Sequence, residues 1–301
     1  MNGLPYRHVD VFAHQPFSGN GLTVFPHAEG LSARFMLRLT QELRQFESIF
    51  LTATAESGVF GARVFTVEEE LPFAGHPALG AGAVLHELQA PESDVATFVL
   101  DLPAGQMRLD SERMGSGAYR VAMEQGRPTF GRMLRKQEEA PFLDALSLEP
   151  ENREDHLPLE VVSTGLPYLI VPVTPNGLLR SRIRAANFEV LLEKIGAKFV
   201  YLFDAEGLEG RTWDNAGAVE DIATGSAAGP TGAYLVRHRV AEAEKPFVLR
   251  QGRFVGRPSE IRVQVAGSAD LPTSVTVAGD VQMVGRGVME AVLPPEDLMA
   301  R

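Results

Sequence analysis

The sequence predicts an α+β protein of two similar domains, each a barrel-like, mostly antiparallel sheet around one central buried helix. Three observations predict this fold: a motif that occurs twice, many short strand patterns, and few helix patterns in 301 residues. A repeat this long in a chain this short indicates two similar domains rather than a solenoid. We place the domains at residues 1–130 and 131–286, with a last strand at about 287–299 that can rejoin the first domain.

The repeated motif spans residues 71–85 and 221–235, and an offset of 150 aligns Gly75 with Gly225. Each copy is a loop followed by a run of Ala, Gly and Leu without a polar face, which is typical of a helix buried on all sides. Pro77 and Pro230 are predicted in the first turns of these helices, where proline is tolerated. Each glycine in such a helix costs about 1 kcal/mol relative to Ala, which indicates that a sheet closes tightly around it.

The start of each buried helix offers unpaired N–H groups and a partial positive charge. We therefore expect the two helix starts, one from each domain, to hold one anionic ligand in a cleft between the domains. The alternative is that both copies are tightly packed Gly/Ala helices without any ligand.

The other elements follow from periodicity and from turn residues. Residue Ser32 is a suitable N-cap for a surface helix over 33–45, whose apolar residues recur at helical spacing. Period-two and apolar runs predict the strands, at 9–12, 22–25, 48–51, 63–67, 97–100 and 119–123 in the first half, and at 199–203, 247–249, 261–265, 275–277 and 288–292 in the second, which residues 161–171 open. A charged, proline-rich stretch at 126–160 with a helix near 142–148 is the expected crossover, and another helix is expected at 187–195.

Composition restricts the class of protein. The net charge is −11 and no basic run occurs, which argues against nucleic acid and against an anionic membrane surface as partners. No apolar run approaches the ~20 residues of a membrane span, and the N-terminus has no signal-peptide core, so we expect a cytoplasmic protein. The chain has no cysteine, and its seven His residues lack the spacing of a metal pair. No metal site is predicted.

Three residues are candidates for acid–base chemistry. Glu47 lies between Phe46 and an apolar strand, and apolar surroundings raise a carboxyl pKa toward the range of a general acid/base. His76 lies at a predicted helix start, where a neutral ring is favoured. Asp221 lies four residues before Gly225. The alternatives are a solvated Glu at a helix end, a capping or packing His, and an Asp held by backbone amides.

Several familiar motifs are excluded, and with them the cofactors that they bind. Ser226, which aligns with His76, can cap its helix or bind a substrate oxygen, but it lacks the Gly-x-Ser-x-Gly frame of a hydrolase nucleophile. No Lys follows the glycines from Gly225 to Gly232, so this is not a phosphate loop. The stretch at 80–82 lacks the third glycine of a dinucleotide-binding loop. We expect no cofactor.

These segments together resemble the phenazine-biosynthesis PhzF-like isomerase family. The likeness runs through nearly the whole chain in the same order and rests on the segments at 10–12 with 16–20, 47–50, 70–77, 220–227 and 251–258. Phe46 and Ile222 depart from the family pattern, which usually has Ser and Pro at these positions. The resemblance implies a diaminopimelate epimerase-like fold with its site between two domains, and a homodimer.

The resemblance also implies the roles of the site residues. Glu47 is the implied acid/base, and His76, Asp221 and Ser226 line the cleft with it. The implied substrate-binding residues are Asn20, Gly75, Thr224, Gly225 and Ser226.

The function we predict is a cofactor-free isomerase that moves a proton between carbons of a small carboxylate-bearing substrate. One alternative is a two-base epimerase or racemase without cysteines, for which Glu47 and Asp221 are a conceivable pair. The other is a catalytically silent small-acid binding protein of the same fold.

Overall fold

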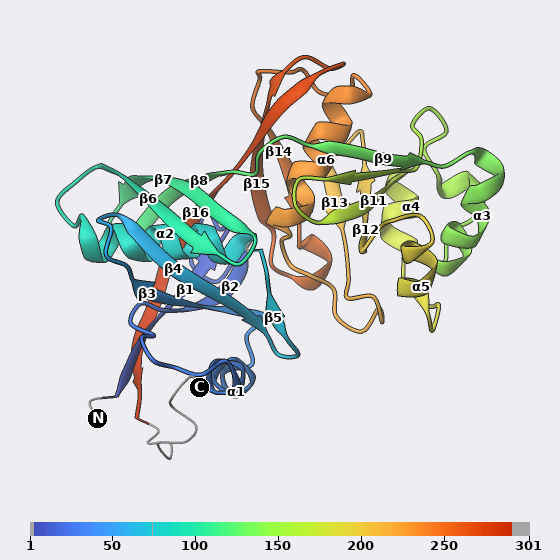
Figure 1. The fold of residues 1–301 in the computed structure, drawn as a ribbon. Helices are drawn as coiled ribbons and strands as arrows, with labels where there is room; N and C mark the ends of the chain where they lie inside the picture. The colour runs from blue at the N-terminus through green and yellow to red at the C-terminus, as the bar shows by residue number, and fades with distance from the viewer. Residues whose placement is uncertain (1–2, 74, 291–301) are drawn as a thin grey trace. The chain divides into compact units, whose positions relative to one another are not determined.

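The computed structural model describes residues 3–73 and 75–290 and shows two compact units (Figure 1). The first unit comprises residues 1–124 and 278–301, and the second comprises residues 125–277. Our sequence-based boundary was 130/131, with a return at about 287. The contacts divide the chain earlier at both points, because β8 ends at Glu124 and the long strand β16 changes unit at Ala278.

The first unit is a closed barrel of eight strands around one helix. The strands follow the order β1-β2-β3-β4-β6-β7-β8-β16, and β16 pairs back onto β1. They are β1 (Leu4–Val11), β2 (Asn20–Phe25), β3 (Glu47–Ala53), β4 (Val59–Thr66), β6 (Val95–Leu102), β7 (Gly105–Gly115), β8 (Ala118–Glu124) and β16 (Pro272–Met289), with β5 (Glu70–Leu71) paired to β4 outside this circuit. The pairs β1–β2, β3–β4, β6–β7, β7–β8 and β1–β16 are antiparallel, whereas β2–β3 and β4–β6 are parallel, so the predicted mostly antiparallel barrel is confirmed.

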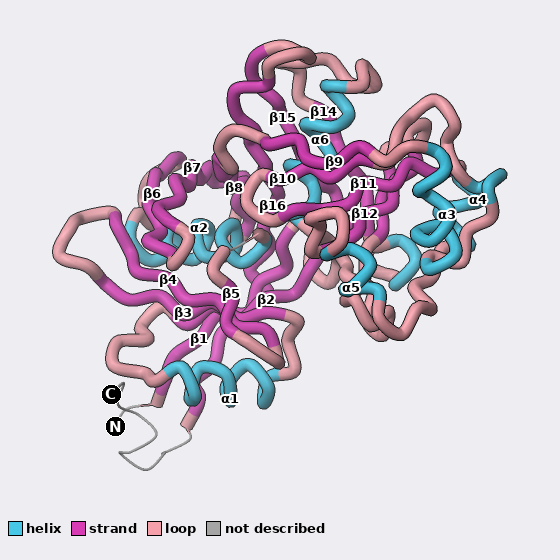
Figure 2. Tube along the Cα trace, turned by 45° about the vertical axis from the view of Figure 1, so that its right-hand side comes forward, coloured by secondary structure: helices cyan, strands magenta, loops and turns pink. Residues whose placement is uncertain are grey.

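Helix α2 (His76–Gln89) lies inside this barrel (Figure 2). Every residue from His76 to His86 is buried. The glycines of the repeat allow this fit. A Cβ on Gly80 would collide with the Leu22 side chain, and one on Gly82 would lie 2.8 Å from Val121 Cγ1. Helix α1 (Ala33–Leu43) packs on the outside of the barrel, against β3 and β4, with Ser32 as its N-cap as predicted.

The second unit is built around helix α6 (Gly225–Arg237). Its strands follow the order β15-β14-β13-β12-β11-β10-β9, and the first part of β16 pairs with β15. They are β9 (Thr129–Met133), β10 (Glu160–Ser163), β11 (Pro167–Val173), β12 (Phe199–Asp204), β13 (Glu209–Arg211), β14 (Phe247–Gln251) and β15 (Ser259–Gly267). Helix α6 contacts β10, β11 and β15, while α3 (Lys136–Ala145), α4 (Pro175–Arg180) and α5 (Phe188–Glu193) contribute to a second apolar core against the sheet.

Some sequence-based expectations need correction. Pro230 is the sixth residue of α6 rather than a first-turn residue, because the helix begins at Gly225. The sequence did not predict β7, β9, β13 or α4, and α3 begins six residues before the predicted helix. The strand expected at 288–292 is the end of β16, which stops at Met289; residues 291–299 of the expected last strand lie outside the described residues.

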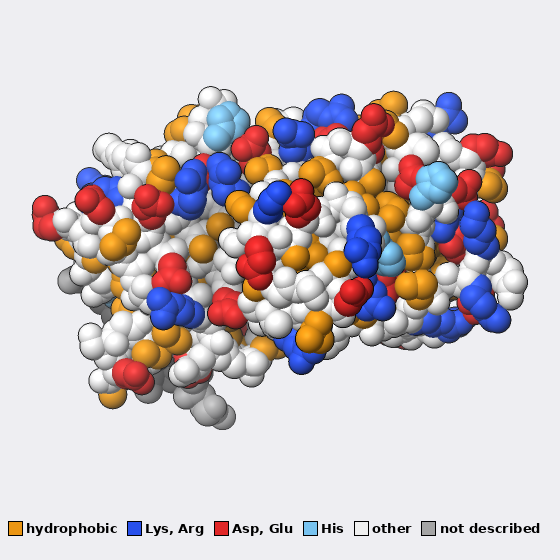
Figure 3. All heavy atoms as spheres, turned by 90° about the horizontal axis from the view of Figure 1, so that it is seen from above, with side chains coloured by type: hydrophobic (Ala, Val, Ile, Leu, Met, Phe, Trp, Pro, Cys, Tyr) orange, Lys and Arg blue, Asp and Glu red, His pale blue; other side chains and the backbone are white. Residues whose placement is uncertain are grey.

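No helix among the described residues is long and apolar enough to cross a membrane. The face drawn in Figure 3 carries Lys and Arg interspersed with Asp and Glu.

Candidate active site

In the first unit, Glu47 and His76 lie side by side at the start of the buried helix. Glu47 is the first residue of β3, and His76 is the first residue of α2. The Glu47 Oε2 atom is 3.5 Å from His76 Nδ1, slightly longer than a hydrogen bond. The two side chains are 13% and 5% exposed, so the pair is shielded from water without being sealed from it.

Burial makes His76 a neutral residue. It lowers the pKa of His76 from 6.5 to about 3, because the charged imidazolium loses its solvation inside the barrel. The contact with Glu47 is therefore not an ion pair at neutral pH. Its Nε2 atom is buried and has no hydrogen-bond partner among the described residues. A buried polar atom without a partner costs free energy, so this nitrogen is a candidate contact for a ligand.

Gly75 caps α2 and contributes no side-chain cap hydrogen bond. Its carbonyl accepts a hydrogen bond from the Ala78 N–H at 3.2 Å, which leaves the N–H groups of Gly75 and His76 without a helical partner, while Pro77 has no N–H. Together with the unpartnered His76 nitrogen, these groups form a polar end on an otherwise apolar helix. Such an end favours a negatively charged group.

In the second unit, the start of α6 carries a different polar pair. The Ser226 hydroxyl lies 2.8 Å from the hydroxyl of Tyr168, which projects from β11 on the α6 side of the sheet. The Gly225 carbonyl accepts a hydrogen bond of 3.0 Å from Gln125 Nε2. The Tyr168 ring also packs against Phe199, with ring centroids 5.5 Å apart.

Asp221 belongs to a buried hydrogen-bond network with Thr224. The Thr224 hydroxyl donates to Asp221 Oδ2, and the Gln251 side-chain amide donates to the same hydroxyl at 2.9 Å. Gln251 also donates to the Asp221 carbonyl and accepts from the Thr224 N–H and the Tyr201 hydroxyl. The Thr224 hydroxyl is thus engaged within the protein, and the network fixes the direction of its proton toward Asp221.

Asn20 is buried at the start of β2, opposite Val11 of β1. The turn before it is held by a hydrogen bond of 2.6 Å from the Phe17 N–H to Asp10 Oδ2. Gly19 has a positive φ of 66° in this turn, and a Cβ there would meet the Val11 carbonyl oxygen, so this position requires glycine.

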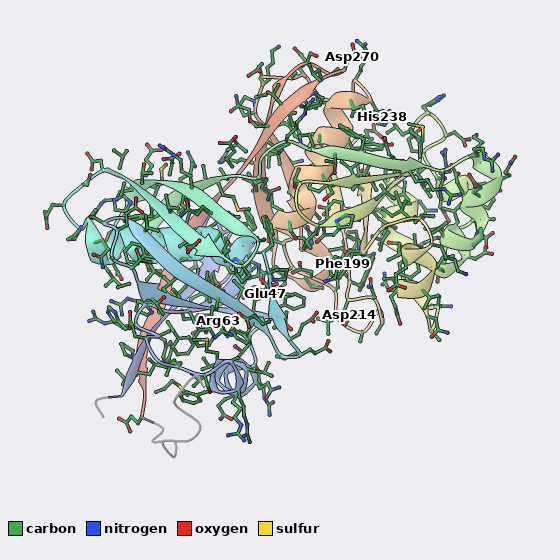
Figure 4. The ribbon with its side chains drawn as sticks, viewed as in Figure 1. Glu47, Arg63, Phe199, Asp214, His238 and Asp270 are labelled. Atoms are coloured by element: carbon green, nitrogen blue, oxygen red, sulfur yellow. The ribbon has the colours of Figure 1, made fainter. Side chains whose placement is uncertain are left out.

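The strand register relates the two units residue by residue. Arg63 on β4 lies opposite Phe50 of β3, and Arg211 on β13 lies opposite Leu202 of β12. Three residues before Phe50 is Glu47, and three residues before Leu202 is Phe199, the first residue of β12. Phe199 therefore occupies in the second unit the position that Glu47 occupies in the first. Figure 4 labels both residues.

The structure thus groups the predicted residues by unit. Glu47, His76 and Gly75 lie together in the first unit, which also contains Asn20. The others, Asp221, Thr224, Gly225 and Ser226, lie together in the second unit. That both groups serve one substrate stays a prediction. In the described part of the chain, no cluster of His, Cys, Asp or Glu is suited to a metal ion.

Comparison with known proteins assigns the chain to a family. The sequence model of the PhzC-PhzF family, described as phenazine biosynthesis-like protein, matches residues 9–287. The chain belongs to the PhzC-PhzF family.

Among curated members of the PhzC-PhzF family, trans-2,3-dihydro-3-hydroxyanthranilate isomerase of Pseudomonas chlororaphis is 31% identical over 290 residues, which cover 94% of this chain and 98% of that protein. The uncharacterized isomerase YddE of Escherichia coli K12 is 32% identical, over 90% of this chain and 93% of that protein. The expected family and the isomerase class are confirmed.

Solved structures share the fold of this chain. A predicted epimerase from Pseudomonas aeruginosa is 48% identical, covers 96% of this chain and 100% of its own, and superposes with a TM-score of 0.91. A hydroxyproline epimerase from Agrobacterium vitis shares the fold alone, with a TM-score of 0.59 at 13% identity over 99% of this chain and 95% of its own.

The sequence did not single out Tyr168 and Gln251, whose side chains contact the predicted site residues Ser226, Asp221 and Thr224. Tyr168 lies in an apolar strand, where an aromatic residue is ordinary, and no local signal shows that its hydroxyl reaches Ser226. Gln251 lies in the segment 251–258 that carries part of the resemblance, which marks the segment but not the side chain.

Proposed function

We propose that this protein is a cofactor-independent isomerase that moves a proton between two carbons of a small carboxylate-bearing substrate, with Glu47 as the general acid/base. The observation that supports this most is the Glu47–His76 pair, a carboxylate 3.5 Å from a neutral imidazole at the start of a buried helix. A carboxylate needs such a position, shielded yet partly open, to exchange a proton with carbon near neutral pH.

In the proposed reaction, the Glu47 carboxylate removes a proton from one carbon, and the electron pair of that C–H bond moves into the adjacent unsaturated system. The protonated Glu47 then returns the proton to a second carbon of the same system. The substrate and product have the same composition, so no oxidant or reductant is required. The transfer needs a geometry that holds both carbons near one oxygen atom.

His76 and the helix start are proposed to stabilise the negative charge that develops on the substrate. The unpartnered His76 Nε2 and the N–H groups of Gly75 and His76 can contact a carboxylate or enolate oxygen. In the second unit, the N–H groups at Gly225 and the Ser226–Tyr168 hydroxyl pair are proposed to hold a second polar group of the substrate. Asp221 is proposed to relay or orient a proton.

The alternative of a two-base epimerase or racemase places one base on each side of a stereocentre. The pseudosymmetry of this chain argues against a duplicated carboxylate, because Phe199 stands at the position equivalent to Glu47. Ser226, the equivalent of His76, is engaged with Tyr168. The remaining two-carboxylate version is a Glu47–Asp221 pair, in which the Asp221 carboxylate already accepts a hydrogen bond from the Thr224 hydroxyl.

Proton exchange in D₂O tests the proposal. Because the relative from Pseudomonas chlororaphis is named for trans-2,3-dihydro-3-hydroxyanthranilate, that acid is the first substrate to incubate with the protein. We expect deuterium to enter carbon-bound positions with wild type and to enter about 10²–10⁴-fold more slowly with Glu47→Gln, which keeps the side chain's size but cannot transfer the proton.

Two results would contradict the proposal. Equal exchange by wild type and Glu47→Gln would remove Glu47 from the chemistry, and Asp221 would be tested next. Tight binding of small acids by wild type with no exchange into any of them would instead favour the catalytically silent binding protein.

Light scattering tests the homodimer that the resemblance implies.

A further inference from the structure

An arginine–glutamate pair stands before the buried helix in the first unit. The Arg63 Nε and Nη2 atoms donate to the two carboxylate oxygens of Glu70, at 2.7 and 2.6 Å. Arg63 also lies over the Phe65 ring, 5.3 Å from its centroid. This two-point contact fixes the direction of both side chains, which a single hydrogen bond does not. Arg63 lies beside β5 in Figure 4.

The second unit repeats this pair with the same geometry. The Arg211 Nε and Nη2 atoms donate to the two oxygens of Glu220, at 2.8 and 2.6 Å. Arg211 lies 4.6 Å from the Trp213 ring centroid and 4.2 Å from that of Phe254. The aromatic residue stands two positions after the arginine in both units, and the glutamate stands five positions before Gly75 or Gly225.

The strand pairing between each aromatic residue and its glutamate is also the same. Phe65 pairs with Glu70 in the β4–β5 ladder, and Trp213 pairs with Glu220 in an isolated bridge. The next residue then caps the turn that separates them. Thr66 Oγ1 accepts from the N–H groups of Glu68 and Glu69, and the Asp214 carboxylate accepts from those of Ala218 and Val219.

The backbone ladder alone is too short to fix these loops. β5 has two residues, and its counterpart is a single bridge, whereas a stable strand pairing normally needs several residues. The position of the loop therefore depends on side chains. The arginine–glutamate pair of the second unit, where the backbone pairing is a single bridge, is also the more deeply buried. The side chains of Arg211 and Glu220 are 1% and 11% exposed, against 34% and 30% for Arg63 and Glu70.

We propose that Arg63–Glu70 and Arg211–Glu220 are a duplicated positioning device, which holds the loop before each buried helix so that the Gly75–His76 and Gly225–Ser226 helix starts keep the geometry needed for proton transfer. The inference rests on the proposed function for its catalytic part. None of the four residues needs to touch the substrate. Their effect on the reaction arises because an error of about 1 Å in a reacting group can cost about 10²-fold in rate.

The half-exposed pair of the first unit gives the cleaner experiment, because a partly solvated ion pair adds little to stability. We expect Glu70→Gln to lower kcat at least about tenfold with little change in KM or in the unfolding temperature. The doubly reversed variant, Arg63→Glu with Glu70→Arg, should restore kcat to within about threefold of wild type by rebuilding the pair. The matched control is Asp110→Asn, which breaks the exposed Arg108–Asp110 ion pair of β7 and should change nothing.

Backbone hydrogen exchange by mass spectrometry separates this inference from the proposed function. In Glu70→Gln, the amides of residues 75–82 should exchange about three- to tenfold faster than in wild type, and those of β7 should not change. If wild type shows no activity on any acid but this exchange pattern appears, the proposed function fails and the positioning role stands. Unchanged exchange and unchanged kcat in Glu70→Gln would overturn the inference, as would failure of the reversed pair to rescue kcat.

Discussion

Phe199 occupies in the second unit the strand position that Glu47 occupies in the first, so the repeat supplies a carboxylate only once. Both residues begin strands that pair with the arginine-bearing strand of the duplicated pair. Around them the two units kept the helix, the glycines and the arginine–glutamate pair, but they differ in the side chain at this point. This difference between the units favours a mechanism in which one acid/base both removes and returns the proton. It argues against a mechanism in which two residues each carry out one of these steps.

A single acid/base predicts transfer of label within one molecule. If a substrate carries deuterium at the carbon that loses its proton, the protonated Glu47 should return part of that deuterium to the receiving carbon before it exchanges with water. Mass spectrometry of the product in ordinary water measures the retained fraction, with label washout from recovered substrate as the control. Complete loss of the label at every stage of the reaction would favour separate donor and acceptor groups.

The buried neutral His76 predicts how stability depends on pH. Its pKa in the folded protein is about 3 against an ordinary 6.5, so below pH 6.5 only the unfolded chain takes up this proton. The contribution of His76 to the free energy of unfolding is therefore constant above pH 6.5. It decreases as the pH falls from 6.5 toward 3, by up to about 1.4 kcal/mol per pH unit. Urea unfolding of wild type and His76→Gln between pH 8 and pH 4 measures it.

The difference between wild type and His76→Gln isolates this residue from other titrating groups. The advantage of wild type should shrink steadily below pH 6.5 and stay constant above it. A difference that is independent of pH would show that the pKa of His76 is the same in the folded and unfolded protein, so that burial does not lower it.

Gln251 is expected to be a large contributor to the stability of the second unit. Its side-chain amide makes hydrogen bonds to Asp221, Thr224 and Tyr201 and is 1% exposed. Gln251→Leu would leave several buried polar groups unpaired and should lower the free energy of unfolding by about 3 kcal/mol. Tyr201→Phe removes one partner only and should cost about 1 kcal/mol. Equal losses in urea unfolding would contradict this account of the network.

The glycines of α2 are expected to be required by packing. Ala is a better helix former than Gly by about 1 kcal/mol, but the new methyl of Gly82→Ala would lie 2.8 Å from Val121 Cγ1. Overpacking costs about 1–3 kcal/mol, so the variant should be less stable than wild type in thermal unfolding. Gly115→Ala on β7, where a Cβ meets nothing within 4 Å, is the matched control and should be nearly neutral.

Much of this fold can be predicted from the sequence because its central feature is local. The Gly/Ala runs at 76–86 and 225–236 predict helices without a polar face. Almost all residues of these runs are buried in the structure, so neither helix needs a polar face. Strand β7 is not predicted because it lies in a polar and charged stretch of the sequence. Only a few apolar residues, such as Met107 and Leu109, alternate there with the exposed ones. Pro230 was misplaced because local preference puts proline in a first turn, whereas here tertiary packing carries the helix through it.

The candidate site is less predictable because its contacts join distant residues. Glu47 and His76 were each nominated from local surroundings, yet their 3.5 Å separation depends on the β3–β4–β5 register. The Tyr168–Ser226 contact and the four bonds of Gln251 link residues far apart in the sequence, and no local pattern encodes them. Thr224 was expected to bind substrate, but whether it does stays a prediction, since its hydroxyl is engaged with Asp221 and Gln251.

Strand β16 has a consequence for how the chain is made. The barrel of the first unit is closed by residues 278–289, although the rest of its strands end at Glu124. During synthesis on the ribosome, one edge of β1 and one edge of β8 therefore stay unpaired until the entire second unit has been made. Synthesis of that unit takes roughly 10–30 s at ordinary elongation rates. Exposed strand edges promote wrong pairings during such a delay. A chaperone that shields these edges early, rather than one that acts on the finished chain, would improve the yield of the folded protein.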